Sequence, residues 1–296
     1  MMLPPDPKAF AAGLRCWSGP VDPEPLPGGL TNTNFVVSDD GRRYVVRVGG
    51  DIPEHGIVRA IELAASQAAA AAGISPIVYH HEPGALVMDF VEGTTLTPEA
   101  VRDPRNLERL VRLVRHAHRD IPRFFRGPAP MFWPFQVIRD YTHTLEDGES
   151  HYLPMLVRLL DAADRLETAV GPIQLVFGHN DLLAANFIDD GTRLWLVDWD
   201  YAGFNSPLFD LGGLASNNSF LAAEGEHLLE LYFERPVDDQ LRRKAAAMTA
   251  ASLLRESMWS MVSEIHSPLA FDYAAYTQEN LRRFEAALAT FDALDR

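Results

Sequence analysis

One eight-residue segment constrains this chain more than any other. It reads His179-Asn180-Asp181-Leu182-Leu183-Ala184-Ala185-Asn186, and Asp198 follows it by twelve residues. A single Asp or Asn in a loop is usually a turn former or a helix cap. Here His179, Asp181, Asn186 and Asp198 fall together between a predicted loop and a predicted hairpin. That combination favours a chemical site over a turn.

The segment resembles the catalytic loop of protein kinases, which reads H-x-D-L-x-x-x-N and is followed by a metal-binding Asp on the next hairpin. Phosphoryl transfer needs a carboxylate that orients the attacking hydroxyl and accepts its proton. It also needs oxygen ligands that hold Mg²⁺ between the nucleotide phosphates. We expect Asp181 to supply the first function, and Asn186 and Asp198 the second. His179 is counted with this catalytic set, as the residue that organises the loop.

Length and composition set the broader limits. The chain has 296 residues with 47% apolar content, which fits two lobes better than one compact domain. Its single cysteine, Cys16, excludes an internal disulfide framework and favours the cytoplasm. The N-terminus has no signal-peptide pattern, and no segment has the roughly 20 apolar residues of a membrane span. A net charge of -15 argues against a nucleic-acid partner.

The order of patterns predicts an α+β fold with two lobes. Two hairpins with Val-rich and aromatic strands flank an Ala-rich helix predicted over residues 54–72. Residues 1–91 are therefore expected to form a small nucleotide-binding lobe on an antiparallel sheet, with a hinge at about residues 88–93. Helical spacing dominates afterwards, so residues 94–296 are expected to form a larger helical lobe that carries the catalytic loop and the substrate pocket.

Four further segments extend the resemblance to one family, the choline/ethanolamine kinases among the aminoglycoside-phosphotransferase-like kinases. The resemblance runs from about residue 28 to 284, and it implies a protein-kinase-like fold, ATP and Mg²⁺ as cofactors, and a small amino alcohol as substrate. The segments are GGLTNTNF at 28–35, YVVRVGG at 44–50, DWDYAGFNSPLFDLG at 198–212 and MWSMVSEIHSPLAFDYAAY at 258–276.

The resemblance also assigns a nucleotide site. Arg47 stands where many relatives carry Lys, and Glu62 on the following helix is its expected partner. Two glycines can let backbone amides approach the ATP phosphates, beside hydroxyl and amide side chains. The residues expected in this loop are Gly28, Gly29, Thr31, Asn32, Thr33 and Asn34, and those whose backbone is expected to meet the adenine are Asp89, Phe90 and Val91.

For the acceptor, the resemblance implies an aromatic pocket, because aromatic faces attract a quaternary ammonium. Eukaryotic choline kinases resemble this chain but have a second Trp where Glu256 stands and an acidic residue near where Asn217 stands. Glu256 is therefore expected to supply the missing negative charge. Asp210 is expected to brace the catalytic loop. The aromatic residues at pocket positions are Tyr201, Trp259, Phe271, Tyr273 and Tyr276.

Several alternatives stay open at this point. Choline is the favoured acceptor, and ethanolamine, an aminoglycoside or another small alcohol are alternatives on the same fold. A catalytically silent nucleotide-binding scaffold is disfavoured, because the base, both metal ligands and the phosphate cation are all present. The sequence does not decide between a monomer and a homodimer.

Overall fold

The computed structural model describes residues 6–294, and the chain divides into two compact units. The first unit contains the residues up to 95 together with 120–129 and 186–200. The second contains residues 96–119, 130–185 and those from 201 onward. The first unit therefore takes in two later segments that a division at residues 91–94 leaves in the C-terminal part.

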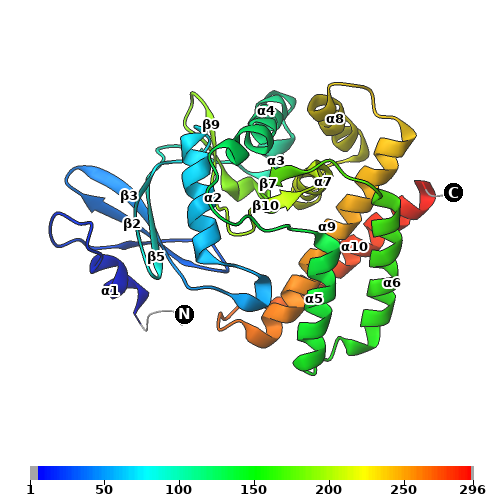
Figure 1. Ribbon diagram of the computed structural model, residues 1–296, viewed down its shortest axis with the longest axis horizontal. Helices are drawn as coiled ribbons and strands as arrows, with labels where there is room; N and C mark the ends of the chain where they lie inside the picture. Colours follow the sequence, from blue (N-terminus) through cyan, green and yellow to red (C-terminus); the bar gives the residue numbers. More distant parts are fainter. Residues whose placement is uncertain (1–5, 295–296) are drawn as a thin grey trace. The chain divides into compact units, whose positions relative to one another are not determined.

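An antiparallel sheet forms the body of the first unit, with strand order β1-β2-β3-β5-β4 (Figure 1). The turn between β2 and β3 has positive φ at Asp40 and Gly41, as a two-residue hairpin turn requires. Alternate residues such as Phe35, Val37 and Val46 are buried on one face. The strands are β1 (Glu24–Leu26), β2 (Thr33–Asp39), β3 (Arg42–Val48), β4 (Val78–Glu82) and β5 (Ala85–Asp89).

The remaining parts of the first unit differ slightly from the prediction. Helix α2 (Arg59–Ala71) begins five residues later than expected, because Pro53–His55 forms a 3₁₀ turn that ends at Gly56 with φ 67°. Strand β1, in a Pro-rich segment, was not predicted; Pro25 is tolerated there because β1 is an edge strand. The other elements are α1 (Pro7–Ala12), 3₁₀ turn η2 (Ile121–Arg123), and the sheet of β6 (Thr94–Thr95), β8 (Phe187–Asp189) and β9 (Leu194–Leu196).

Helix α9 (Asp239–His266) is the centre of the second unit (Figure 1). It packs against α5 (Pro134–Asp147), α6 (Leu153–Val170), α7 (Pro207–Asn217) and α10 (Tyr273–Leu294). Its buried residues are almost continuous from 247 to 263, as expected for a helix that is covered all round. The unit also contains α3 (Pro98–Arg102), most of α4 (Pro104–Asp120), α8 (Ala222–Phe233), and the antiparallel pair β7 (Val176–Gly178) and β10 (Gly203–Asn205).

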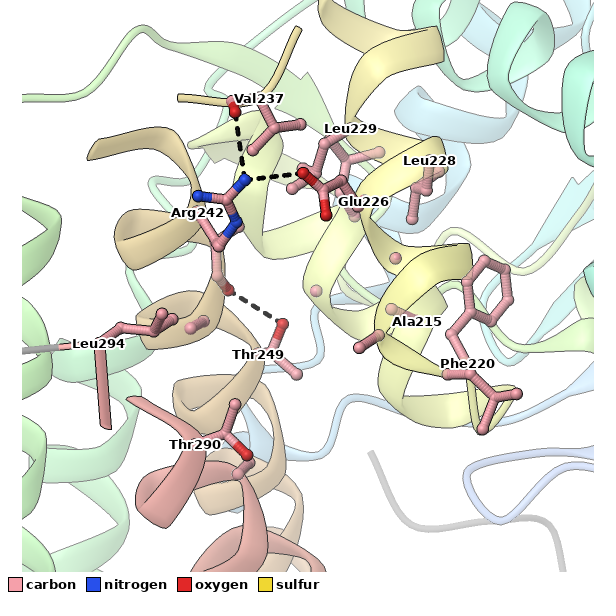
Figure 2. Close-up of a pocket in the computed structure, with 18 residues that line it drawn as sticks. Ala215, Phe220, Glu226, Leu228, Leu229, Val237, Arg242, Thr249, Thr290 and Leu294 are labelled. Atoms are coloured by element: carbon pink, nitrogen blue, oxygen red, sulfur yellow. Dashed lines mark hydrogen bonds and ion pairs between the residues drawn. The ribbon is translucent and has the colours of Figure 1, made fainter. Parts of the chain in front are cut away.

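A pocket of about 470 Å³ lies among helices α7, α8, α9 and α10 (Figure 2). The pocket exists because several side chains that line these helices are small. Its polar side chains form hydrogen bonds with other groups of the protein. Nη2 of Arg242 donates to Glu226 at 2.7 Å and to the Val237 carbonyl at 3.3 Å. The hydroxyls of Thr249 and Thr290 donate to carbonyls one turn earlier. The pocket therefore has an apolar wall and lacks the charged groups of the candidate site described below.

Within residues 6–294, none of the helices combines the length and apolar character needed to span a bilayer.

We predict that Gly212→Ala destabilises the protein by about 1–3 kcal/mol, because α7 and α9 approach closely at this position. A Cβ on Gly212 would lie 2.9 Å from the backbone nitrogen of Thr249. The matched control is Gly213→Ala, whose Cβ would lie 3.5 Å from Oγ of Ser252, an ordinary contact. Urea unfolding followed by tryptophan fluorescence measures both variants, and equal midpoints would contradict the prediction.

Candidate active site

A cluster of five charged side chains lies in the first unit, where β3, α2 and the segment after β9 meet. Nη2 of Arg47 lies 2.7 Å from Asp198 and 2.8 Å from Asp200, and its Nε lies 2.9 Å from Glu62. Nη1 of Arg59 lies 2.8 Å from Glu62 and 2.9 Å from Asp200. The structure thus brings together the predicted pair of Arg47 and Glu62 and adds two partners, Arg59 and Asp200.

These ion pairs are buried, and burial alters the pKa values of the carboxyl groups. Arg47, Glu62 and Asp200 are each less than 8% exposed. Burial alone would raise the pKa of Asp200, but the guanidinium groups of Arg47 and Arg59 outweigh it and hold that pKa well below its ordinary value. Burial, followed by the nearby Asp200 carboxylate, raises the pKa of Glu62 to about 7. Asp200 therefore stays ionised between the two guanidinium groups, which it shares with Glu62.

The predicted phosphate loop folds onto this cluster. Gly28 and Gly29 have φ of 108° and 86°, values that other L residues rarely adopt. Oγ1 of Thr31 donates to Asp200 at 2.7 Å, and Nδ2 of Asn32 lies 3.2 Å from the same carboxylate. The other two predicted loop residues, Thr33 and Asn34, begin strand β2.

The two predicted metal ligands lie at the same end of the β8–β9 hairpin. The backbone nitrogen of Val197 donates to the Asn186 carbonyl at 3.0 Å. The backbone positions of Asn186 and Asp198 are therefore close together. The Asp198 side chain is 27% exposed, and its backbone has φ 73°. An amide and a carboxylate oxygen are ligands that suit Mg²⁺, which in kinases completes its shell with phosphates and water. This donor set fits the expected cation.

The predicted hinge keeps part of its backbone occupied. The amide of Asp89 donates to the Ile77 carbonyl at 2.9 Å, and the amide of Phe90 donates to Arg43 at 3.0 Å. Contact of residues 89–91 with adenine remains a prediction, and the amides of Asp89 and Phe90 are already used within the protein.

In the second unit, Asp210 holds the backbone of the predicted catalytic loop. Its carboxylate accepts hydrogen bonds from the amides of His179 at 2.8 Å and Asn180 at 2.6 Å. Nε2 of His118 lies 2.8 Å from the same carboxylate, and Nδ1 of His118 lies 2.7 Å from the Tyr232 hydroxyl. Burial would raise the pKa of Asp210, but these bonds, that of His118 foremost, hold it below its ordinary value.

Asn180 shapes the turn that presents Asp181. Its φ is 66°, in the left-handed region that asparagine adopts more readily than most residues other than glycine. Its Nδ2 donates to the carbonyls of Tyr201 at 2.9 Å and Gly203 at 3.2 Å, and its Oδ1 accepts from Asn205 at 3.0 Å. These bonds hold the turn in place beside the candidate base.

Asp181 lies next to a buried arginine that the sequence did not single out. Nη2 of Arg255 is 3.8 Å from the Asp181 carboxylate, and Nη1 is 3.0 Å from Glu256. The Tyr276 hydroxyl donates to Glu256 at 2.8 Å. Arg255 also lies over the Tyr201 ring, 5.4 Å from its centre. Asp181 and the predicted pocket residue Glu256 thus share one guanidinium.

The predicted aromatic residues also gather in the second unit. Nε1 of Trp259 donates to the Tyr201 hydroxyl at 2.9 Å. The Trp259 ring meets Tyr273 and Tyr276 edge to face, with centroids 6.0 and 6.4 Å apart. Phe271 packs on Tyr276 at 5.7 Å but is 41% exposed. The cluster is assembled, although much of its ring surface faces other rings.

Sequence signals existed for some of the residues that were overlooked. Asp200 stands two positions after Asp198, and Arg59 precedes Glu62 by three, the spacing of neighbours on one helix face. Arg255 interrupts an apolar run before Trp259, where a charge needs a buried partner. The link from His118 to Asp210 spans 92 positions and has no local signal.

We predict that Asp210→Asn destabilises the protein by about 2–4 kcal/mol at pH 7, because the amide nitrogen would face donors that now meet a carboxylate. The pKa of Asp210 is lowered on folding, so its stabilising contribution is present above its ordinary value of 3.8 and is lost as the pH falls below it.

The free energy of unfolding should therefore differ most between the two proteins at pH 5–7, and the difference should shrink below about pH 3.8. Urea titrations across this range test it, with Asp22→Asn, whose side chain is 86% exposed, as control. An unfolding difference that stays constant with pH would contradict the role given to the Asp210 charge.

Solved structures share this fold. The structure of a choline/ethanolamine kinase family protein from Mesorhizobium loti has a TM-score of 0.78 at 29% identity, covering 95% of this chain and 93% of that one. LicA solved in complex with AMP has a TM-score of 0.73 at 22% identity, covering 95% and 97%. Spectinomycin phosphotransferase, solved with ADP and spectinomycin, has a TM-score of 0.60 at 14% identity, covering 92% and 94%.

Curated relatives and a family model agree with the structures. A probable ethanolamine kinase from Arabidopsis thaliana is 26% identical over 287 residues, covering 86% of this chain and 76% of that protein. Protein LicA from Haemophilus influenzae is 25% identical over 278 residues, covering 90% and 79%. The model of the choline/ethanolamine kinase family matches residues 24–222, well over half of the chain. The chain therefore belongs to the choline/ethanolamine kinase family, and it is a phosphotransferase with an alcohol group as acceptor.

Proposed function

We propose that the protein transfers the γ-phosphoryl group of Mg-ATP to the hydroxyl of a short amino alcohol, choline or ethanolamine. One observation carries the choice of acceptor. The candidate base Asp181 and the carboxylate of Glu256 lie on one guanidinium, 3.8 and 3.0 Å away, beside the aromatic cluster of the second unit. A hydroxyl and a cationic nitrogen in the same small molecule can meet these two carboxylates together.

On the acceptor side, Asp181 would orient the hydroxyl and take its proton as the oxygen bonds to phosphorus. The bond between the γ-phosphorus and the bridging oxygen breaks, and its electrons leave with ADP. Asp210 and Asn180 support this step indirectly by fixing the loop backbone. Because the loop is held from both ends of the turn, Asp181 is presented in a defined direction.

On the nucleotide side, Arg47 and Arg59 would face the phosphates, with Glu62 and Asp200 holding both cations. Asn186 and Asp198 would hold Mg²⁺, which when bound neutralises phosphate charge. The amides that follow Gly28 and Gly29 would cover the phosphates. Electrostatic stabilisation of this kind supplies most of the catalysis in phosphoryl transfer.

We predict that Asp181→Asn lowers kcat by ~10²–10⁴-fold while the KM for ATP changes little, because only the proton acceptor is removed. ADP release from Mg-ATP in the presence of ethanolamine and of choline measures the effect. The matched control is Asp239→Asn, which removes a fully exposed carboxylate on the same unit. Near-normal turnover of Asp181→Asn would refute the role of this residue.

We also predict that ATP raises the melting temperature much more with Mg²⁺ than without it. Saturation at 100 times Kd corresponds to about 2.7 kcal/mol of stabilisation. Asp198→Ala should lose most of the metal-dependent part, because a carboxylate ligand is gone. Differential scanning fluorimetry with ATP, Mg-ATP and Mg²⁺ alone tests this. A wild-type protein that ATP stabilises equally with and without Mg²⁺ would favour a silent nucleotide-binding protein.

A further inference from the structure

Arg255 is the buried cation of the second unit that the proposed mechanism has not yet used. It lies on α9, is 3% exposed, and its Nε has no hydrogen-bond partner among the described residues. Removing a guanidinium from water without full hydrogen bonding is costly, and replacing it by an apolar side chain of similar size often stabilises a protein. A role in the reaction accounts for its presence better than stability does.

The contacts of Arg255 connect the two ends of the expected acceptor. Nη2 faces Asp181, which would meet the hydroxyl, and Nη1 faces Glu256. These nitrogens are attached to the same carbon, so the two carboxylates are separated by a short span. The span suits a hydroxyl and an ammonium that are two carbons apart, and it is too short for functional groups at opposite ends of a large sugar.

Glu256 adds a preference among short amino alcohols. The Tyr276 hydroxyl and Arg255 use only part of its hydrogen-bonding capacity, since a carboxylate has about four acceptor positions. An ammonium with N–H groups can donate to the remaining positions, whereas a trimethylated nitrogen has no donor and relies on exposed ring faces. Here Trp259 and Tyr273 are each 5% exposed, so the ring surface that a trimethylated nitrogen could use is limited to the half-buried Tyr276 and the exposed Phe271.

We propose that Arg255 is a positioning residue and Glu256 a specificity residue, which together make an acceptor with a primary or secondary ammonium the preferred substrate over a quaternary one. This inference rests on the proposed function. Arg255 fixes the Asp181 carboxylate and balances the charge of Glu256, so the pocket carries one net negative charge for one cationic acceptor.

The first test compares kcat/KM of the wild-type enzyme for ethanolamine, N-methylethanolamine, N,N-dimethylethanolamine and choline. We expect a decrease along this series, with the largest step where the last N–H is lost. Glu256→Gln should lower kcat/KM for ethanolamine by roughly 10-fold to 100-fold, the loss of a charge-assisted hydrogen bond, and lower that for choline much less. A wild-type preference for choline, or an equal effect of Glu256→Gln on both, would overturn the specificity role.

The second test concerns Arg255. Arg255→Met should lower kcat by roughly 10²-fold for every acceptor, because Asp181 is no longer held in position, while the KM for ATP stays unchanged. Arg255→Lys should restore part of the kcat, since it keeps the charge without the planar fork. The double variant Arg255→Met with Glu256→Gln keeps the charge balance and guards against simple misfolding, and stabilisation by Mg-ATP shows that each variant is folded.

Unchanged kcat in a folded Arg255→Met variant would overturn the positioning role. Failure of the proposed function gives a different result, because the wild-type enzyme would then turn over none of the four amino alcohols.

Discussion

Removal of charged side chains from water is the constraint on which the charged cluster of each unit depends. In the first unit, two arginines and three carboxylates compensate one another around Asp200. In the second unit, Asp210 accepts hydrogen bonds from two loop amides, and Arg255 lies beside the carboxylates of Asp181 and Glu256. A buried charge with one partner removed costs several kcal/mol. Each charged side chain is therefore fixed in position by its neighbours, which is the property that a phosphoryl-transfer site requires.

Two residues of the candidate site have a left-handed backbone. Asn180, which precedes the candidate base, and Asp198, the candidate metal ligand, have φ of 66° and 73°. Such conformations cost about 1–3 kcal/mol and persist only when surrounding bonds determine them. Asn180 has three side-chain bonds of this kind to the segment at 201–205. A backbone held in this way restricts the direction of the neighbouring side chain more than a freely moving loop would.

Family membership and acceptor choice rest on different evidence. The fold and the family follow from similarity over most of the chain, including similarity to a probable ethanolamine kinase and to protein LicA. The proposed acceptor, in contrast, depends on a few side chains of α9 and α10, among them the ion pair of Arg255 and Glu256. Small changes at such positions alter the substrate while leaving the fold intact.

The sequence by itself determined the order of the main elements, the two main hairpins and the catalytic-loop pattern, because periodicity, turn residues and motif spacing are local properties. The pairing of Arg47 with Glu62 followed from the family resemblance. The sequence-based prediction missed strand β1, because an edge strand forms only by pairing with its neighbour β2. It also began α2 too early, because residues 53–55 form a 3₁₀ turn instead. Only the tertiary structure decided that His118 meets Asp210, that Arg59 joins Asp200, and that Arg255 links Asp181 to Glu256. These contacts join parts of the chain that are far apart in the sequence and that packing brings together. A charged side chain needs a partner only when it is buried, and residue spacing alone does not show which charges are buried.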